Sequence, residues 1–212
     1  AYEIRPRDWE FRRVLFRSGS GKSTILEYIG RNYNARVIQA DKVGHLMMET
    51  GQPGYYQVVE TFGSGILNGD QTVNRAKLSA LVFEKPELLA KLEKIIHPAV
   101  KTYIVEEIDK EREAGKLSLV LVEAALLIED NYRVLCDEFW YIYASDDIRR
   151  ERLKRSRGYS DEKVERIMAH QLSAEEYRRH CAKEIDNNGE LSYVYVQIDR
   201  KMRESGIRKR QE

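Results

Sequence analysis

Short apolar runs alternate along the chain with stretches in which apolar residues recur at helical spacing. Three runs predict strands, at 35–40, 117–122 and 138–143, and a weaker run lies at 182–185. The stretches between these runs are long enough to contain crossover helices. The order of the runs therefore predicts an α/β fold built from βαβ units around a parallel sheet.

The region between the first two of these predicted strands shows helical spacing only. Helices are predicted at 75–83, 86–96 and 98–113, and the last two carry Pro86 and Pro98 in their first turns, where proline is tolerated. We interpret residues 51–115 as a helical insertion in the sheet domain.

Two charged segments complete the pattern. Residues 146–178 read as a highly charged helical stretch that is interrupted near Gly158. A basic segment from Arg203 onwards ends the sequence, and we expect it to fray.

Composition narrows the class of protein. The 212 residues include 36 Lys and Arg against 35 Asp and Glu, so the net charge is +1 and provides no overall field for nucleic acid or membranes. Cys136 and Cys181 lack metal-ligand spacing, which is typical of reduced thiols. No apolar run reaches the length of a membrane span. We expect a cytoplasmic protein that binds neither nucleic acid nor membrane.

The strongest chemical signal is a phosphate-binding loop. It comprises Gly19, Ser20, Gly21, Lys22, Ser23 and Thr24. Such glycines let successive N–H groups face one anion, while the lysine reaches the β- and γ-phosphates of ATP and the following hydroxyl ligates Mg²⁺. A flexible Gly/Ser linker is the alternative, but an apolar-periodic helix begins directly after the loop. The loop predicts ATP and Mg²⁺ binding through Lys22 and Ser23.

The segment that precedes this loop is atypical. Phe16 stands where the full motif has its first glycine, and Arg17 places a bulky side chain in the loop. The first eighteen residues contain five arginines, and only residues 14–16 are apolar enough for the end of a strand. We predict that residues 1–18 are foreign to the domain.

An acidic residue follows the predicted strand at 35–40. Asp41 stands at the strand end, where parallel sheets place their ligands, and could accept a proton from an acceptor hydroxyl. It could instead cap a helix or hold Mg²⁺ through water. With the loop, it indicates phosphoryl transfer.

Several separated motifs together resemble the dephospho-CoA kinase family. They are Ala40-Asp41, Arg75-Ala76-Lys77-Leu78 with Val82-Phe83, His97-Pro98, Leu126-Leu127-Ile128-Glu129, Arg152-Leu153, Arg166 with Gln171, and Ile185-Asp186-Asn187. Each motif is weak by itself, but their order and spacing are specific. The resemblance extends from Gly19 to Asn188.

The resemblance implies a P-loop nucleotide-kinase fold, a three-layer α/β/α architecture with a parallel sheet. Its core would comprise residues 19–50, 116–145 and 180–202, with the substrate-binding insertion at 51–115, a helical lid at 146–179 and the basic tail at 203–212. The implied reaction transfers the γ-phosphate of ATP to the ribose 3′-hydroxyl of dephospho-CoA. We expect a monomer or a weak homo-oligomer.

The resemblance also suggests roles for individual residues. Asp41 would be the general base and Arg152 would act with Lys22 on the phosphates, as one of five lid arginines at 149, 150, 152, 155 and 157. Substrate would contact Arg75, His97, Leu126, Leu127 and Glu129. Other readings are core packing for the two leucines, helix capping for Arg75, and capping or an interior position for His97. Glu123, where an Asp is common, could hold Mg²⁺ through water.

Three other functions compete with this one. Another small-molecule or nucleoside kinase would share the fold. A GTPase switch is disfavoured, because residues 41–44 fit Asp-x-x-Gly but the sequence has no Asn-Lys-x-Asp motif for guanine. A non-catalytic nucleotide-binding protein is the third, since the segment before the loop is atypical.

Overall fold

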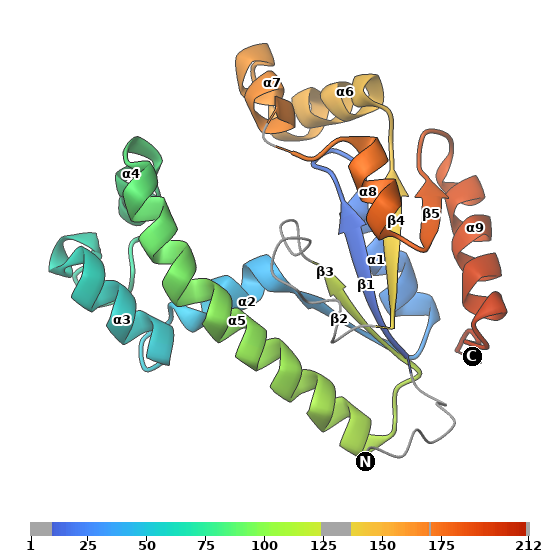
Figure 1. The fold of residues 1–212 in the computed structure, drawn as a ribbon, viewed down its shortest axis with the longest axis horizontal. Helices are drawn as coiled ribbons and strands as arrows, with labels where there is room; N and C mark the ends of the chain where they lie inside the picture. The colour runs from blue at the N-terminus through green and yellow to red at the C-terminus, as the bar shows by residue number, and fades with distance from the viewer. Residues whose placement is uncertain (1–9, 124–136, 170, 211–212) are drawn as a thin grey trace. The chain divides into compact units, whose positions relative to one another are not determined.

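The computed structural model describes residues 10–123, 137–169 and 171–210, and it contains one five-stranded sheet (Figure 1). The strands are β1 (Glu10–Phe16), β2 (Ala35–Gln39), β3 (Leu119–Glu123), β4 (Glu138–Tyr143) and β5 (Lys183–Asp186). Their order in the sheet is β2-β3-β1-β4-β5. The pairs β1–β3, β1–β4 and β4–β5 are parallel, as the alternation of runs predicts.

The chain forms two compact units, one of residues 1–38 and 111–212 and one of residues 39–110. The first, the sheet unit, has the helices α1 (Lys22–Asn32), α6 (Asp146–Arg157), α7 (Asp161–Ala169), α8 (Ala174–His180) and α9 (Leu191–Glu204). The second, the helical unit, has α2 (Ala40–Met47), α3 (Pro53–Phe62), the 3₁₀ turn η1 (Ser64–Ile66), α4 (Arg75–Glu84) and most of α5 (Pro86–Ala114).

Helices cover both faces of the sheet, which confirms the three-layer architecture. Successive side chains of β4 pack in different helical layers. Trp140 and Ile142 belong to a core with α1 and α9. Tyr141 stacks instead on Tyr177 of α8, with ring centroids 5.0 Å apart. Figure 1 shows α8 over β4 and α9 beside β5. Strand β3 is buried along its whole length, as expected of a strand covered on two sides.

Strand β1 is longer than the three residues predicted from the sequence. It pairs with β3 from Glu10 and with β4 from Arg12, and it occupies the middle of the sheet. Arginine is unusual in a central parallel strand, where both faces are normally covered. That residues 1–18 are foreign to the domain stays a prediction.

The prediction of two separate helices at 86–96 and 98–113 is wrong. In the helical unit, α5 is a single helix of 29 residues that continues through Pro98. Proline there removes one backbone hydrogen bond and costs about 3 kcal/mol in a helix interior. An apolar residue nevertheless recurs at every fourth position, at 88, 92, 96, 100, 104 and 108. Val100, Ile104 and Ile108 are buried, and Leu88, Leu92 and Ile96 pack on the core of this unit. Burial of this continuous stripe outweighs the local cost of the proline.

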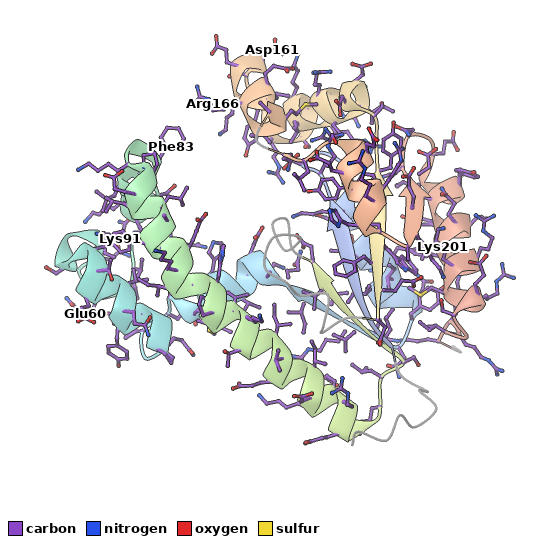
Figure 2. The ribbon with its side chains drawn as sticks, in the orientation of Figure 1. Glu60, Phe83, Lys91, Asp161, Arg166 and Lys201 are labelled. Carbon is purple, nitrogen blue, oxygen red and sulfur yellow. The ribbon has the colours of Figure 1, made fainter. Side chains whose placement is uncertain are left out.

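Helices α6 and α7 lie within residues 146–179, the segment whose role as a lid stays a prediction. The break near Gly158 is confirmed, because this glycine ends α6 with φ 62°. Leu153 packs with Val164 and Met168 in a small separate core. Arg166, one of the motif residues, lies on the exposed side of α7 (Figure 2).

The expectation that the basic segment frays is wrong for residues 207–210. Ile207 belongs to the sheet core and is 4% exposed. Lys209 pairs with Asp199 of α9 at 2.7 Å, and the Arg210 N–H donates to the Asn32 carbonyl at 2.8 Å. The signal that sequence reading overlooked is the isolated apolar residue, which anchors the segment beside the end of α1.

Among the helices that the structure describes, none is both long and apolar enough to cross a membrane.

Candidate active site

The loop between β1 and α1 has the backbone of an anion cradle. Gly19 and Gly21 have φ of 81° and 84°, a region that favours glycine. A Cβ on Gly19 would lie 2.8 Å from the carbonyl oxygen of Arg149. Gly21 precedes α1 without a side-chain cap, and the first turn holds no acidic residue. The first N–H groups of α1 can therefore bind an anion, as the sequence predicts.

Lys22, the first residue of α1, forms an ion pair with Glu123 at the end of β3. The side chain of Glu123 is 2% exposed and that of Lys22 is 25% exposed. The pair keeps the ammonium beside the loop and compensates a buried carboxylate. The sequence suggests a water-mediated Mg²⁺ contact for Glu123 but does not predict its pairing with Lys22.

Arg152, one of the five arginines of α6, lies against the loop at Gly21. Its Nη1 is 3.5 Å from the position of a Cβ on Gly21 and is buried without a hydrogen-bond partner among the described residues. Burial and the neighbouring Arg155 lower the pKa of Arg152. A guanidinium in this setting is suited to an incoming anion.

The other arginines of α6 have different contacts. Arg150 pairs with Glu165 at 2.6 Å, Arg155 with Glu151 at 3.4 Å, and Arg157 lies 5.9 Å from the centroid of Tyr159. These are the contacts of a solvated charged helix, which was the alternative reading of this stretch.

Arg149 is completely buried and serves the loop in another way. Its Nε donates to the Ser18 carbonyl at 2.9 Å and its Nη2 to Gln171 Oε1 at 2.6 Å. Gln171 in turn accepts from the Ser18 N–H at 3.1 Å and donates to the Ser18 hydroxyl at 3.0 Å. Arg149 of α6 and Gln171, which follows α7, thus connect the segment predicted as a lid to Ser18, directly before the loop. Sequence reading assigned neither residue this role, because the partners are far apart along the chain.

Arg17 does not obstruct the loop. The residue is 7% exposed, and its guanidinium forms an ion pair with Asp146 at 2.8 Å. Burial by itself raises the pKa of Asp146, but Arg17 and Arg149 outweigh it and hold the pKa below its usual value.

Buried polar atoms without a partner gather around this loop. Within the described ranges, those in or beside the loop are Arg17 Nε, Ser20 Oγ, Arg152 Nη1 and Asn187 Oδ1. All except the last can donate a hydrogen bond. A surplus of unused donors beside a helix N-terminus fits the phosphates of a nucleotide.

The acidic residue after β2 has a different local position from the one expected. Strand β2 ends at Gln39, so Asp41 lies in the first turn of α2. Gln39 is the N-cap of α2, which removes helix capping as the role of Asp41. The carboxylate is exposed and therefore accessible to a substrate.

The helical unit contains a pocket of about 530 Å³. It is lined by His45, Met48, Arg75, Ala76, Leu78, Ser79, Val82 and Leu92. A nitrogen of the Arg75 guanidinium lies 3.0 Å from His45 Nδ1. The side chain of Asn74 caps α4 by accepting from the Lys77 N–H at 3.0 Å, so capping is not the role of Arg75.

The remaining predicted residues lie outside this pocket. His97 is partly buried within α5 and does not line it. Phe83, from the same motif as the lining residue Val82, is 75% exposed at the end of α4 (Figure 2). Leu126, Leu127 and Glu129 lie outside the described residues.

The predicted site residues fall in both units. Lys22, Ser23 and Arg152 belong to the sheet unit, whereas Asp41 and Arg75 belong to the helical unit. Their approach around one substrate stays a prediction. In the described part of the chain, no group of three or more His, Cys, Asp or Glu residues could hold a metal ion.

Comparisons with known proteins identify the dephospho-CoA kinase family. A family model described as dephospho-CoA kinase matches residues 18–192. The dephospho-CoA kinase of Streptococcus mutans is 34% identical over 184 residues, covering 87% of this chain and 91% of that protein. The dephospho-CoA kinase of Aquifex aeolicus is 36% identical over 181 residues, covering 85% and 89%. The structure of the dephospho-CoA kinase of Campylobacter jejuni superposes with a TM-score of 0.67 at 20% identity, covering 92% and 98%.

Proposed function

Because this chain belongs to the dephospho-CoA kinase family, we propose that it transfers the γ-phosphoryl group of ATP to the ribose 3′-hydroxyl of dephospho-CoA. The products are coenzyme A and ADP. The assignment of dephospho-CoA as the substrate rests on the family match. The assignment of ATP is supported by the loop at 19–24 and by the unused buried donors in and beside it.

The phosphates of ATP would be held by the loop and the N-terminus of α1. Backbone N–H groups and Lys22 would neutralise the β- and γ-phosphates, which requires the ammonium to share or leave its pairing with Glu123. Arg152, with its buried unpartnered Nη1, would stabilise the charge that spreads over the transferred group.

Asp41 would act as the general base. Its carboxylate would accept the proton of the 3′-hydroxyl as that oxygen bonds to the γ-phosphorus and the bond to the β–γ bridging oxygen breaks. ADP leaves with the electron pair of the broken bond. The exposed position of Asp41 in α2 supports this role.

Mg²⁺ would be held by the exposed Ser23 hydroxyl and the phosphates, with Glu123 as a contact through water. When bound, the ion neutralises phosphate charge. The residues present fit this arrangement, because nucleotide kinases bind Mg²⁺ largely through substrate oxygens.

The pocket of the helical unit would receive the acceptor substrate. Leu78, Val82 and Leu92 provide an apolar lining for the pantetheine arm, and Arg75 provides a charge for a phosphate. Contacts from His97, Leu126, Leu127 and Glu129 remain part of this proposal.

The direct test is ATP-dependent conversion of dephospho-CoA to coenzyme A by the purified chain, followed by mass spectrometry. We expect one ADP for each coenzyme A and no product from a Lys22→Ala variant. Shikimate and a panel of nucleosides serve as alternative acceptors. Phosphorylation of one of these with dephospho-CoA untouched would replace the substrate, and nucleotide binding without any turnover would indicate a non-catalytic protein.

We also propose that the protein works in the cytoplasm as a monomer or a weak homo-oligomer. The two cysteines without metal-ligand spacing support a reducing compartment. Sedimentation across a concentration series tests the oligomeric state.

A further inference from the structure

Asn187, the residue that follows β5, connects the far end of the sheet unit to the phosphate loop. It is 1% exposed, and its backbone N–H donates to the Tyr143 carbonyl at 2.8 Å, which fixes it beside the end of β4. Its side-chain Nδ2 donates to the Ser20 carbonyl at 2.6 Å. The two residues are 167 positions apart, so this contact is a product of the folded sheet.

The geometry of a peptide bond gives this contact a consequence for the loop. The peptide between Ser20 and Gly21 is trans, so the Ser20 carbonyl and the Gly21 N–H point to opposite sides of one plane. Holding the carbonyl toward Asn187 turns the Gly21 N–H the other way. Loop N–H groups with this orientation are what a phosphate needs, whereas an inward carbonyl would repel it.

Gly21 is the place where this peptide could otherwise rotate. Its φ of 84° is accessible to glycine, and glycine also tolerates the alternative orientations of the preceding peptide. A Cβ on Gly21 would overlap Asn187 Nδ2, so the glycine and the amide fit each other closely. The loop therefore contains a flexible residue and a buried amide that restrains it.

We infer that Asn187 is a positioning residue for the nucleotide, because its amide keeps the Gly21 N–H facing the phosphates. It acts through the loop and does not need to touch ATP. The inference concerns nucleotide binding only, so it holds for any acceptor and is independent of the proposed substrate.

Two substitutions separate this role from simple packing. Asn187→Ala removes the donor at every pH. Asn187→Asp keeps the shape, but the carboxylate cannot donate and repels the Ser20 carbonyl, whereas its protonated form can donate through O–H. Asn34→Asp is a matched control, because Asn34 also donates from its amide to a backbone carbonyl, that of Lys116, away from the loop.

The measurement is the Kd for ATP and ADP, by calorimetry without acceptor, from pH 5.5 to 8.5. For Asn187→Ala we expect a Kd raised about tenfold at every pH. For Asn187→Asp we expect a similar loss at high pH and recovery relative to the unmodified protein as the pH falls, since burial raises the pKa of a carboxyl group. Asn34→Asp should bind as the unmodified protein does.

Two results would overturn the inference. One is an unchanged nucleotide Kd in both Asn187 variants. The other is a lower melting temperature with no pH-dependent recovery in Asn187→Asp, which would make the contact purely structural. If Asn187→Ala does not fold, the pH series of Asn187→Asp decides alone. The Kd measurements contain no acceptor, so they test the inference even if the proposed kinase reaction is not observed.

Discussion

The ammonium of Lys22 and the carboxylate of Glu123 form an ion pair between the start of α1 and the end of β3. A carboxylate as buried as that of Glu123 needs a compensating charge, and the lysine of the phosphate loop supplies it. The same lysine is expected to serve the phosphates, so the pair joins the stability of the sheet unit to nucleotide binding.

Lys22→Ala should therefore change two properties. Phosphoryl transfer should be abolished, and the free energy of unfolding should fall by about 1–3 kcal/mol, because Glu123 is left buried without its ammonium. The double variant Lys22→Ala with Glu123→Gln should recover most of the stability and none of the activity. Denaturant unfolding and a coupled ADP assay measure both. Equal stability of the single and double variants would show that Glu123 does not depend on Lys22.

Arg152→Lys should lower kcat about tenfold or more, because a lysine retains the charge but loses the planar fork that spreads over the phosphoryl oxygens. Arg150→Lys is the matched control on the same helix, since Arg150 pairs with Glu165. Steady-state kinetics of both variants should show a loss for Arg152→Lys alone. Similar rates in the two variants would make Arg152 a surface charge.

Asp41→Asn should leave the Kd for ATP unchanged and lower turnover about 10²-fold or more, because the amide cannot accept the proton of the acceptor. Calorimetry with ATP and single-turnover transfer separate the two effects. Turnover near that of the unmodified protein would remove Asp41 as the base.

The ion pair between Lys209 and Asp199 leads to a prediction about how stability depends on pH. Burial by itself raises the pKa of Asp199, but hydrogen bonds from Lys209, Tyr33 and Tyr28 outweigh it and lower the pKa. A carboxyl group whose pKa is lower in the folded state stabilises the fold at pH values above its unfolded-state pKa, which is about 4. This stabilisation is lost as the pH falls through the folded-state pKa.

Asp199→Asn should thus lower the free energy of unfolding by about 1–2 kcal/mol at pH 7, and the difference should shrink below about pH 4. Urea titrations of both proteins across this range provide the measurement. A constant difference at all pH values would mean that the charge of Asp199 does not contribute.

Local patterns were sufficient to predict much of this molecule. The strand at 138–143 and the helix end at Gly158 follow from residues that are adjacent in the sequence, and the loop at 19–24 has a motif of its own. The family resemblance selects Arg152 from five arginines, and its role stays a prediction; its guanidinium lies beside Gly21.

The missed features depend on distant partners. Pro98 reads locally as a helix start, but it lies inside α5 because the apolar stripe on both sides is buried together. Arg149 looks like a lid charge, yet Ser18 and Gln171 surround its guanidinium. Lys209 resembles a solvated tail residue until Asp199 is placed beside it. Pairings across such sequence distances are set by the sheet and leave no periodic signal.

The contact between Asn187 and Ser20 also determines when the loop can reach its final conformation during synthesis. A ribosome adding about 5–20 residues per second would need roughly 10 to 30 seconds to advance from Ser20 to Asn187. Throughout that interval the Ser20 carbonyl lacks the Asn187 amide as a donor. The phosphate loop is translated well before Asn187, so the restraint on the Ser20 carbonyl forms only after β5 has joined the sheet.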